Sequence, residues 1–156
     1  MSTKGSPSEP SSTAPGILLV EDEATPRAEI CRTVRGLGYR VSTARNGREA
    51  LRYLEQHPGE IRLVLSDIIM PYMDGGELAE RARDLLPGLR FVLMSASLEG
   101  MAGEVVSAYP ETPVLRKPFS FAELYAVLVG QIGPPLGKGR LRPSRPAFHR
   151  DREPST

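Results

Sequence analysis

Cysteine, histidine and tryptophan are scarce in this chain. Its 156 residues include one cysteine, two histidines and no tryptophan. The single cysteine, Cys31, cannot form an internal disulfide, which fits a reducing compartment. Cys31 falls on the apolar side of an expected helix, so we interpret it as a core residue rather than a reactive thiol. His57 and His149 have no neighbours in the sequence that would suggest a metal site.

Long apolar runs and an excess of charge of one sign are also absent. No run approaches the roughly 20 apolar residues that a membrane-spanning helix needs. No apolar segment precedes residue 16, so the N-terminus does not have the pattern of a secretory signal. The formal net charge of +1 gives no field that would direct the chain toward nucleic acid or a membrane. We therefore expect a soluble, cytoplasmic protein.

The two ends of the chain differ in composition from its middle. Residues 1–15 are mainly Ser, Pro, Thr and Gly, which predicts a disordered N-terminal tail. Residues 133–156 are Pro-rich and basic and contain no helix-turn-helix pattern, which predicts a disordered C-terminal tail. We interpret this tail as a solvated terminus; binding to an acidic partner or to nucleic acid is the alternative, which its shortness and mixed charge do not favour. One domain, residues 16–132, lies between the tails.

Short apolar segments alternate with segments of helical periodicity in this domain. Strands are expected at 16–20, 40–44, 61–66, 91–94 and 113–116. Helices are expected after Thr25-Pro26, Asn46-Gly47 and Asp74-Gly75-Gly76, over 97–109, and after Ser120. Thr25 is expected to cap the first helix with Pro26 at its first position, and Ser120 to form a capping box with Glu123. The 97–109 helix is expected to be weak, because each of its glycines costs roughly 1 kcal/mol relative to alanine.

This alternation predicts an α/β fold with a doubly wound, five-stranded parallel sheet and helices on both faces. The third strand is nearly all apolar, as a central strand covered on both faces should be. The second strand is short and partly polar, as an edge strand would be. Right-handed crossovers place the carboxyl ends of all five strands at one edge of the sheet.

Polar side chains follow four of the five strands at this edge. They are Glu21 and Asp22, Asp67, Ser95, and Lys117. Each has an ordinary structural explanation by itself: Asp67 as a turn cap, Ser95 as a helix cap and Lys117 as a solvated loop residue. Three carboxylates, a hydroxyl and an amine meeting at one sheet edge favour a functional site instead.

Four sequence blocks carry a resemblance to a known family. They are Leu-Val-Glu-Asp-Glu, Ser-Asp-Ile-Ile-Met-Pro-Tyr-Met-Asp-Gly, Met-Ser-Ala and Lys-Pro-Phe. In order and spacing they resemble the receiver domain of two-component response regulators, over about residues 16–131. The chain looks similar to receivers fused to hybrid histidine kinases, or to stand-alone relatives of them. The resemblance implies a flavodoxin-like sheet.

The resemblance also implies roles for the residues at the sheet edge. Asp67 would be the phospho-acceptor, with Lys117 and Ser95 contacting the phosphoryl group. Mg²⁺ would be held by Asp22, Asp67 and the main-chain carbonyl of Ile69, with Glu21 acting through a water. The chemistry agrees, because neighbouring carboxylates repel one another and a hard divalent cation relieves that repulsion. The family pattern further implies a cis Lys117-Pro118 peptide bond.

Several positions depart from the family pattern. Receivers often carry Asp where Glu21 stands, and Glu is one methylene longer. The position three residues before Lys117 is usually aromatic and is Val114 here, which is stiff at χ1 and cannot report phosphorylation by a large ring rotation. We therefore expect the signal to travel through the 97–109 segment. Ile69 offers no group to orient an attacking water, which predicts slow to moderate loss of the phosphoryl group.

The sequence thus predicts a phospho-accepting receiver that takes its phosphoryl group from a histidine kinase or a histidine phosphotransfer protein. It would signal by binding a downstream protein, without turning over a separate substrate as an enzyme does. A pseudo-receiver that binds partners without phosphorylation is the alternative. A phosphatase of the haloacid-dehalogenase type is disfavoured, because it needs a second Asp two residues after the nucleophile, where this chain has Ile69.

Overall fold

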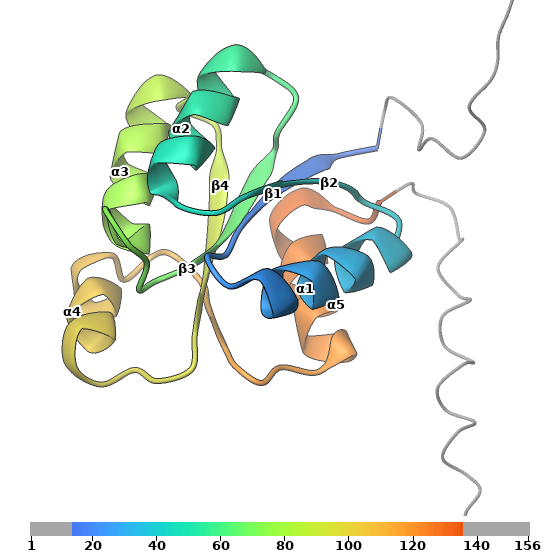
Figure 1. Ribbon diagram of the computed structural model, residues 1–156. Helices are drawn as coiled ribbons and strands as arrows, with labels where there is room; N and C mark the ends of the chain where they lie inside the picture. Colours follow the sequence, from blue (N-terminus) through green and yellow to red (C-terminus); the bar gives the residue numbers. More distant parts are fainter. Residues whose placement is uncertain (1–13, 136–156) are drawn as a thin grey trace, which may run out of the picture.

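A five-stranded parallel sheet forms the centre of the molecule (Figure 1). The computed structural model describes residues 14–135. The strands are β1 (Gly16–Val20), β2 (Arg40–Ala44), β3 (Leu63–Asp67), β4 (Arg90–Ser95) and β5 (Val114–Arg116). Their order in the sheet is β2-β1-β3-β4-β5, so the apolar β3 is central and the partly polar β2 is an edge strand, as the sequence predicted.

Five helices cover the two faces of this sheet. They are α1 (Ala24–Gly36), α2 (Gly47–Gln56), α3 (Gly75–Leu85), α4 (Gly100–Ala108) and α5 (Phe121–Ile132). Helices α1 and α5 lie on one face, and α2, α3 and α4 lie on the other (Figure 1). The predicted fold class, a doubly wound α/β sheet, is confirmed.

The alternation of side chains along β1 explains why this strand is apolar throughout. Ile17 and Leu19 point into the core beneath α1 and α5, whereas Leu18 and Val20 point into the core beneath α2 and α3. All four side chains are fully buried. A strand with both faces covered leaves no position for a polar residue until it ends, and the first polar residue after β1 is Glu21.

The start of α1 differs from the prediction. The helix begins at Ala24 with Glu23 as its N-cap residue, so Thr25 is not the cap and Pro26 is the third helical residue. Glu23 makes no side-chain capping bond. The extended backbone of Glu23 (φ −93°, ψ 130°), rather than a hydroxyl, marks the start of this helix.

The other helix ends follow the predicted chemistry more closely. Asn46 caps α2, and Ser120 and Glu123 form the predicted capping box at α5. The expected 97–109 helix is shorter, from Gly100 to Ala108, because Gly100 adopts a left-handed φ of +60° at its start. A glycine is the residue that adopts this conformation without strain.

Two described residues just outside the predicted domain limits contact the domain. Ala14 is buried and its carbonyl accepts a hydrogen bond from Arg40 Nε at 2.9 Å. At the other end the Tyr39 hydroxyl donates to the carbonyl of Gly133 at 2.7 Å. The remainder of both predicted tails, residues 1–13 and 136–156, lies outside the described residues, and the limits 16 and 132 stay predictions. Within residues 14–135 no helix is long and apolar enough to cross a membrane.

Candidate functional site

Three carboxylates meet where β1 and β3 end. These strands are neighbours in the sheet, with Val20 paired to Ser66, so the residues that follow emerge side by side. Glu21 and Asp22 follow β1, and Asp67 is the last residue of β3. One oxygen from each carboxylate lies within 4.8 Å of the others. The structure therefore brings together the three predicted acidic residues.

Lys117 closes this acidic group from the far side of β4. Its ammonium lies 2.8 Å from Glu21 Oε1 and 2.9 Å from Asp67 Oδ1. The main-chain N–H of Lys117 donates to the carbonyl of Ser95 at 2.9 Å, which fixes the chain after β5. The Lys117-Pro118 peptide bond is cis, as the family pattern implied.

The shared lysine and the burial of the carboxylates set the protonation of the site. Burial and the hydrogen bond with Glu21 raise the pKa of Asp67 to about 7, and Lys117 opposes this rise. Burial also acts to raise the pKa of Glu21, but hydrogen bonds from Asp67, Lys117 and the Glu23 N–H lower it overall. At neutral pH Glu21 is therefore the ionised partner of Lys117, while Asp67 keeps its proton to a higher pH than an exposed aspartate does.

Ser95 lies at the end of β4 beside Asp67, but its hydroxyl is turned to its own loop. Ser95 Oγ donates to the carbonyl of Ser97 and accepts from the Ser97 N–H at 3.3 Å. The side chain is buried. The predicted phosphoryl contact therefore requires this hydroxyl to exchange its bond to Ser97 for one to the ligand.

The turn after Asp67 is shaped by a glycine. A Cβ on Gly75 would lie 2.5 Å from the carbonyl oxygen of Asp67, so only glycine allows α3 to start this close to β3. Gly75 N–H donates to the carbonyl of Ile68 at 2.7 Å, and Asp74 caps α3. Ile69, which lies in this turn, is 50% exposed.

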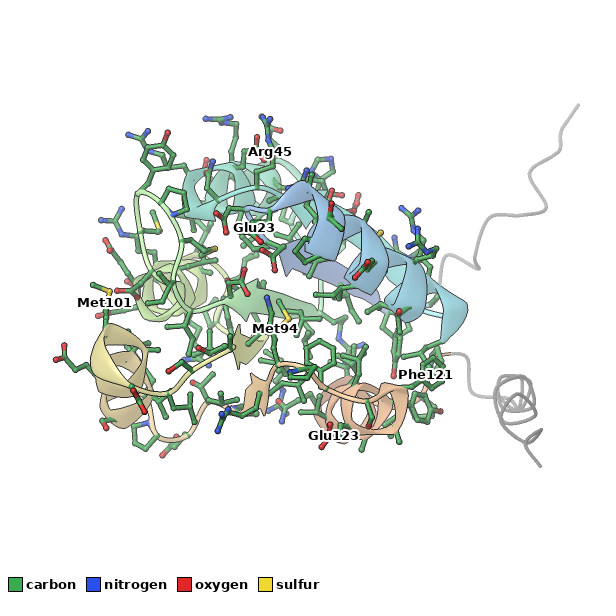
Figure 2. All side chains as sticks on the ribbon, turned by 60° about the horizontal axis from the view of Figure 1, so that its bottom comes forward. Glu23, Arg45, Met94, Met101, Phe121 and Glu123 are labelled. Carbon is green, nitrogen blue, oxygen red and sulfur yellow. The ribbon has the colours of Figure 1, made fainter. Side chains whose placement is uncertain are left out.

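An open cleft of about 660 Å³ surrounds these groups. Its lining contains every predicted site residue: Glu21, Asp22, Asp67, Ile69, Ser95 and Lys117. It also contains residues to which the sequence assigned no role in the site, among them Glu23, Glu99 and Met101. Figure 2 shows Glu23 at the start of α1 and Met101 on α4, on different sides of Met94 at the end of β4. The sequence could have indicated these residues only by their location, because they come shortly after the ends of strands β1 and β4.

Val114 is half-buried and packs beside a small apolar cluster between the sheet and α4. The aromatic side chain at this cluster is Tyr109, which lies at the end of α4 rather than on β5. Its hydroxyl donates to Glu80 Oε1 on α3 at 2.8 Å. Tyr109 was also missed, because nothing in its local sequence connects it to α3.

Comparison with known proteins identifies the family. The model described as "Response regulator receiver domain" matches residues 17–129. The chain belongs to this receiver family. The resemblance seen in the four sequence blocks, and the two-component receiver function that it implied, are thereby confirmed.

Among curated proteins, this receiver is similar to two from Brucella abortus. It is 37% identical to the sensor kinase CckA over 108 residues, which are 69% of this chain and 11% of that protein. It is 34% identical to the response regulator receiver protein CpdR over 108 residues, which are 69% of this chain and 88% of that protein. The chain thus spans a small part of the first relative and most of the second.

Solved structures give the same result. The receiver domain from the hybrid histidine kinase CckA matches with a TM-score of 0.62 and 33% identity, over 74% of this chain and 97% of that one. The response regulator TrrA from Thermotoga maritima, solved in complex with Mg²⁺ and BeF, matches with a TM-score of 0.66 and 28% identity. That match covers 76% of this receiver and 99% of TrrA.

Proposed function

We propose that this receiver accepts a phosphoryl group on Asp67 from a phosphohistidine, with Mg²⁺ bound beside it. The main support is that Asp67 lies at the same sheet edge as two other carboxylates and the Lys117 ammonium. The phosphohistidine would belong to a histidine kinase or a histidine phosphotransfer protein. The phosphorylated form would act in the cytoplasm by binding a downstream protein, without turnover of a separate substrate.

The donor set fits a magnesium ion. Three carboxylate oxygens within 4.8 Å are hard ligands of the kind that Mg²⁺ prefers. Asp22, Asp67 and the Ile69 carbonyl would hold the ion directly. Glu21 Oε1 is paired with Lys117 and Oε2 accepts the Glu23 N–H at 3.2 Å, which suits a role through a water. When bound, Mg²⁺ would neutralise charge on the oxygens of the transferred group.

Asp67 is suited to act as the nucleophile once it is ionised. A carboxylate oxygen would form the new O–P bond while the P–N bond of the phosphohistidine breaks; with a proton on its other ring nitrogen, the histidine leaves as neutral imidazole with the bonding electrons. The Lys117 ammonium already contacts the Asp67 carboxylate, so a small movement would bring it to an oxygen of the phosphoryl group, where it would stabilise the negative charge. Ser95 can donate to a second oxygen after releasing the Ser97 carbonyl.

The signal would leave the site through the loop after Ser95. Movement of the Ser95 hydroxyl breaks its bond to Ser97, and the chain then enters α4 at Gly100. Helix α4 has no side-chain cap and contains a second glycine, Gly103, so its remodelling costs little. Val114 has no ring that could rotate inward on phosphorylation. We therefore expect the conformational change to occur in α4.

Binding of beryllofluoride, an analogue of the phosphoryl group, tests this proposal. With Mg²⁺ present, ¹⁹F NMR should show bound fluoride resonances for the wild type and none for Asp67→Ala, which lacks the accepting oxygen. The same spectrum without Mg²⁺ should lack them too. Wild-type protein that gives no bound resonance with Mg²⁺ would favour the pseudo-receiver instead.

A further inference from the structure

The lining of the cleft carries far more negative than positive charge. Its carboxylates are Glu21, Asp22, Glu23, Asp67 and Glu99, and its ammonium is Lys117. Lys117 is already paired with both Glu21 and Asp67. Even with Mg²⁺ bound, the walls that an incoming phosphodonor meets are therefore acidic, and a cleft lined by one sign of charge concentrates ions of the other sign.

Of the acidic residues that line the cleft, Glu99 is the most distant in sequence from the proposed metal ligands. It is the N-cap residue of α4, but its side chain makes no capping bond. Its backbone is held by a hydrogen bond from its N–H to Ser97 Oγ at 3.1 Å. Within residues 14–135 the structure shows no ion pair or hydrogen bond of the Glu99 carboxylate, so no described partner offsets its charge.

We propose that Glu99 is a specificity-determining residue that disfavours small anionic phosphodonors at Asp67. The inference rests on the proposed phosphoryl acceptance. A small donor has only the cleft to bind to, so its negative charge meets Glu99 without compensation. A phosphohistidine protein also gains contacts outside the cleft, and these can offset the same repulsion. The acidic wall thus favours a protein as the donor.

Acetyl phosphate is the small donor for which the effect can be measured. In the reaction an Asp67 oxygen forms a bond to phosphorus, the bond between phosphorus and the acetyl oxygen breaks, and acetate leaves with the electron pair. The ionised form of Asp67 reacts, so no proton moves in this step. The anionic donor must approach through the cleft mouth, so the charge of Glu99 acts on its encounter rate.

The experiment compares the second-order rate constant for phosphorylation by acetyl phosphate in the wild type, Glu99→Gln and Glu99→Lys. Glu104→Gln is the matched control, because Glu104 is exposed on the same helix but does not line the cleft. At low ionic strength Glu99→Gln should raise the constant by roughly threefold to tenfold, and Glu99→Lys by more. Since the Debye length is about 10 Å at 0.1 M salt, added salt should shrink the gain.

Beryllofluoride, which is also anionic, supplies an equilibrium readout. It should bind Glu99→Gln with Mg²⁺ more tightly than it binds the wild type, and Glu104→Gln like the wild type. No gain at Glu99, or an equal gain at Glu104, overturns the inference while leaving phosphoryl acceptance intact. A wild type that is never phosphorylated contradicts the proposed function itself, and the inference falls with it.

Discussion

Lys117 contacts the carboxylate of Asp67 at 2.9 Å across the carboxyl edge of the sheet. The two residues end β3 and follow β5, and β4 lies between those strands. The proposed acceptor is thus paired with a cation before any phosphoryl group arrives. In the proposed mechanism the ammonium would compete with Mg²⁺ for the carboxylate at rest, and it would pass to the phosphoryl group during transfer.

Replacement of Lys117 by methionine should separate these two effects. Without the ammonium, Glu21 and Asp67 are free to interact with Mg²⁺, so the magnesium affinity should rise. The phosphorylation rate should nevertheless fall by about 100-fold or more, since a positioned cation that stabilises developing charge is worth that much. Titration calorimetry and acetyl phosphate kinetics measure the two quantities. Lys117→Arg, which keeps the charge, is the control; weaker Mg²⁺ binding by Lys117→Met would contradict the account.

The raised pKa of Asp67 predicts how stability depends on pH without metal. Native protein keeps a proton on Asp67 up to about pH 7, whereas the unfolded chain releases it near the ordinary value of 3.8. The native state therefore binds more protons between these values, and the free energy of unfolding should fall as pH rises through them. The lowered pKa of Glu21 acts in the opposite direction, but below its ordinary value of 4.5.

Urea unfolding in EDTA between pH 5 and 7.5 measures this dependence. Asp67→Asn cannot titrate at this position, so its stability should change less with pH than that of the wild type. Stabilisation of the wild type by Mg²⁺ should increase over the same range, because the ion binds the deprotonated carboxylate. Parallel pH profiles for the two proteins would refute the assignment.

The contact between α3 and α4 depends on Gly76. A Cβ at this position would lie 2.6 Å from the Tyr109 ring and 2.8 Å from Val105 Cγ1, which is closer than real contacts allow. Gly76→Ala should therefore destabilise the protein by about 1–3 kcal/mol and increase hydrogen exchange in α4. Gly130→Ala in α5 meets no atom within 4 Å and is the matched helical control. It should stabilise the protein by up to about 1 kcal/mol.

Ile69 should limit hydrolysis of the phosphorylated form. Its side chain is 50% exposed in the cleft wall and carries no hydrogen-bonding group. Ile69→Asn adds an amide that can orient a water toward phosphorus, so it should shorten the lifetime of the phosphoryl group. Intact mass followed over time after removal of the donor measures that lifetime. A wild-type half-life of seconds, or no change in the variant, would contradict the prediction.

The fold and the centre of the site could be predicted because both follow from chain-wide patterns. The third strand is nearly all apolar, which identified it as a central strand. Parallel strands then send Glu21, Asp22 and Asp67 to one edge, whatever loops join them. Lys117 was expected at the same edge because it follows the fifth strand, and the family pattern added the cis bond to Pro118, which is present in the structure.

Features that depend on one loop conformation or one side-chain rotation could not be predicted. The N-cap of α1 is a backbone property of Glu23, and the hydroxyl of Thr25 was a misleading signal. Glu99 lines the cleft from the loop between β4 and α4, and the sequence contains no pattern that predicts the path of this loop. The Ser95 hydroxyl points toward Ser97, and no sequence pattern predicts this side-chain rotation.

Intact-protein mass spectrometry after incubation with acetyl phosphate and Mg²⁺ tests the central claim most directly. One phosphoryl adduct is expected on the wild type, and none on Asp67→Ala or on the wild type without metal. An adduct that survives in Asp67→Ala would place the acceptor elsewhere, and no adduct on the wild type would contradict phosphoryl acceptance.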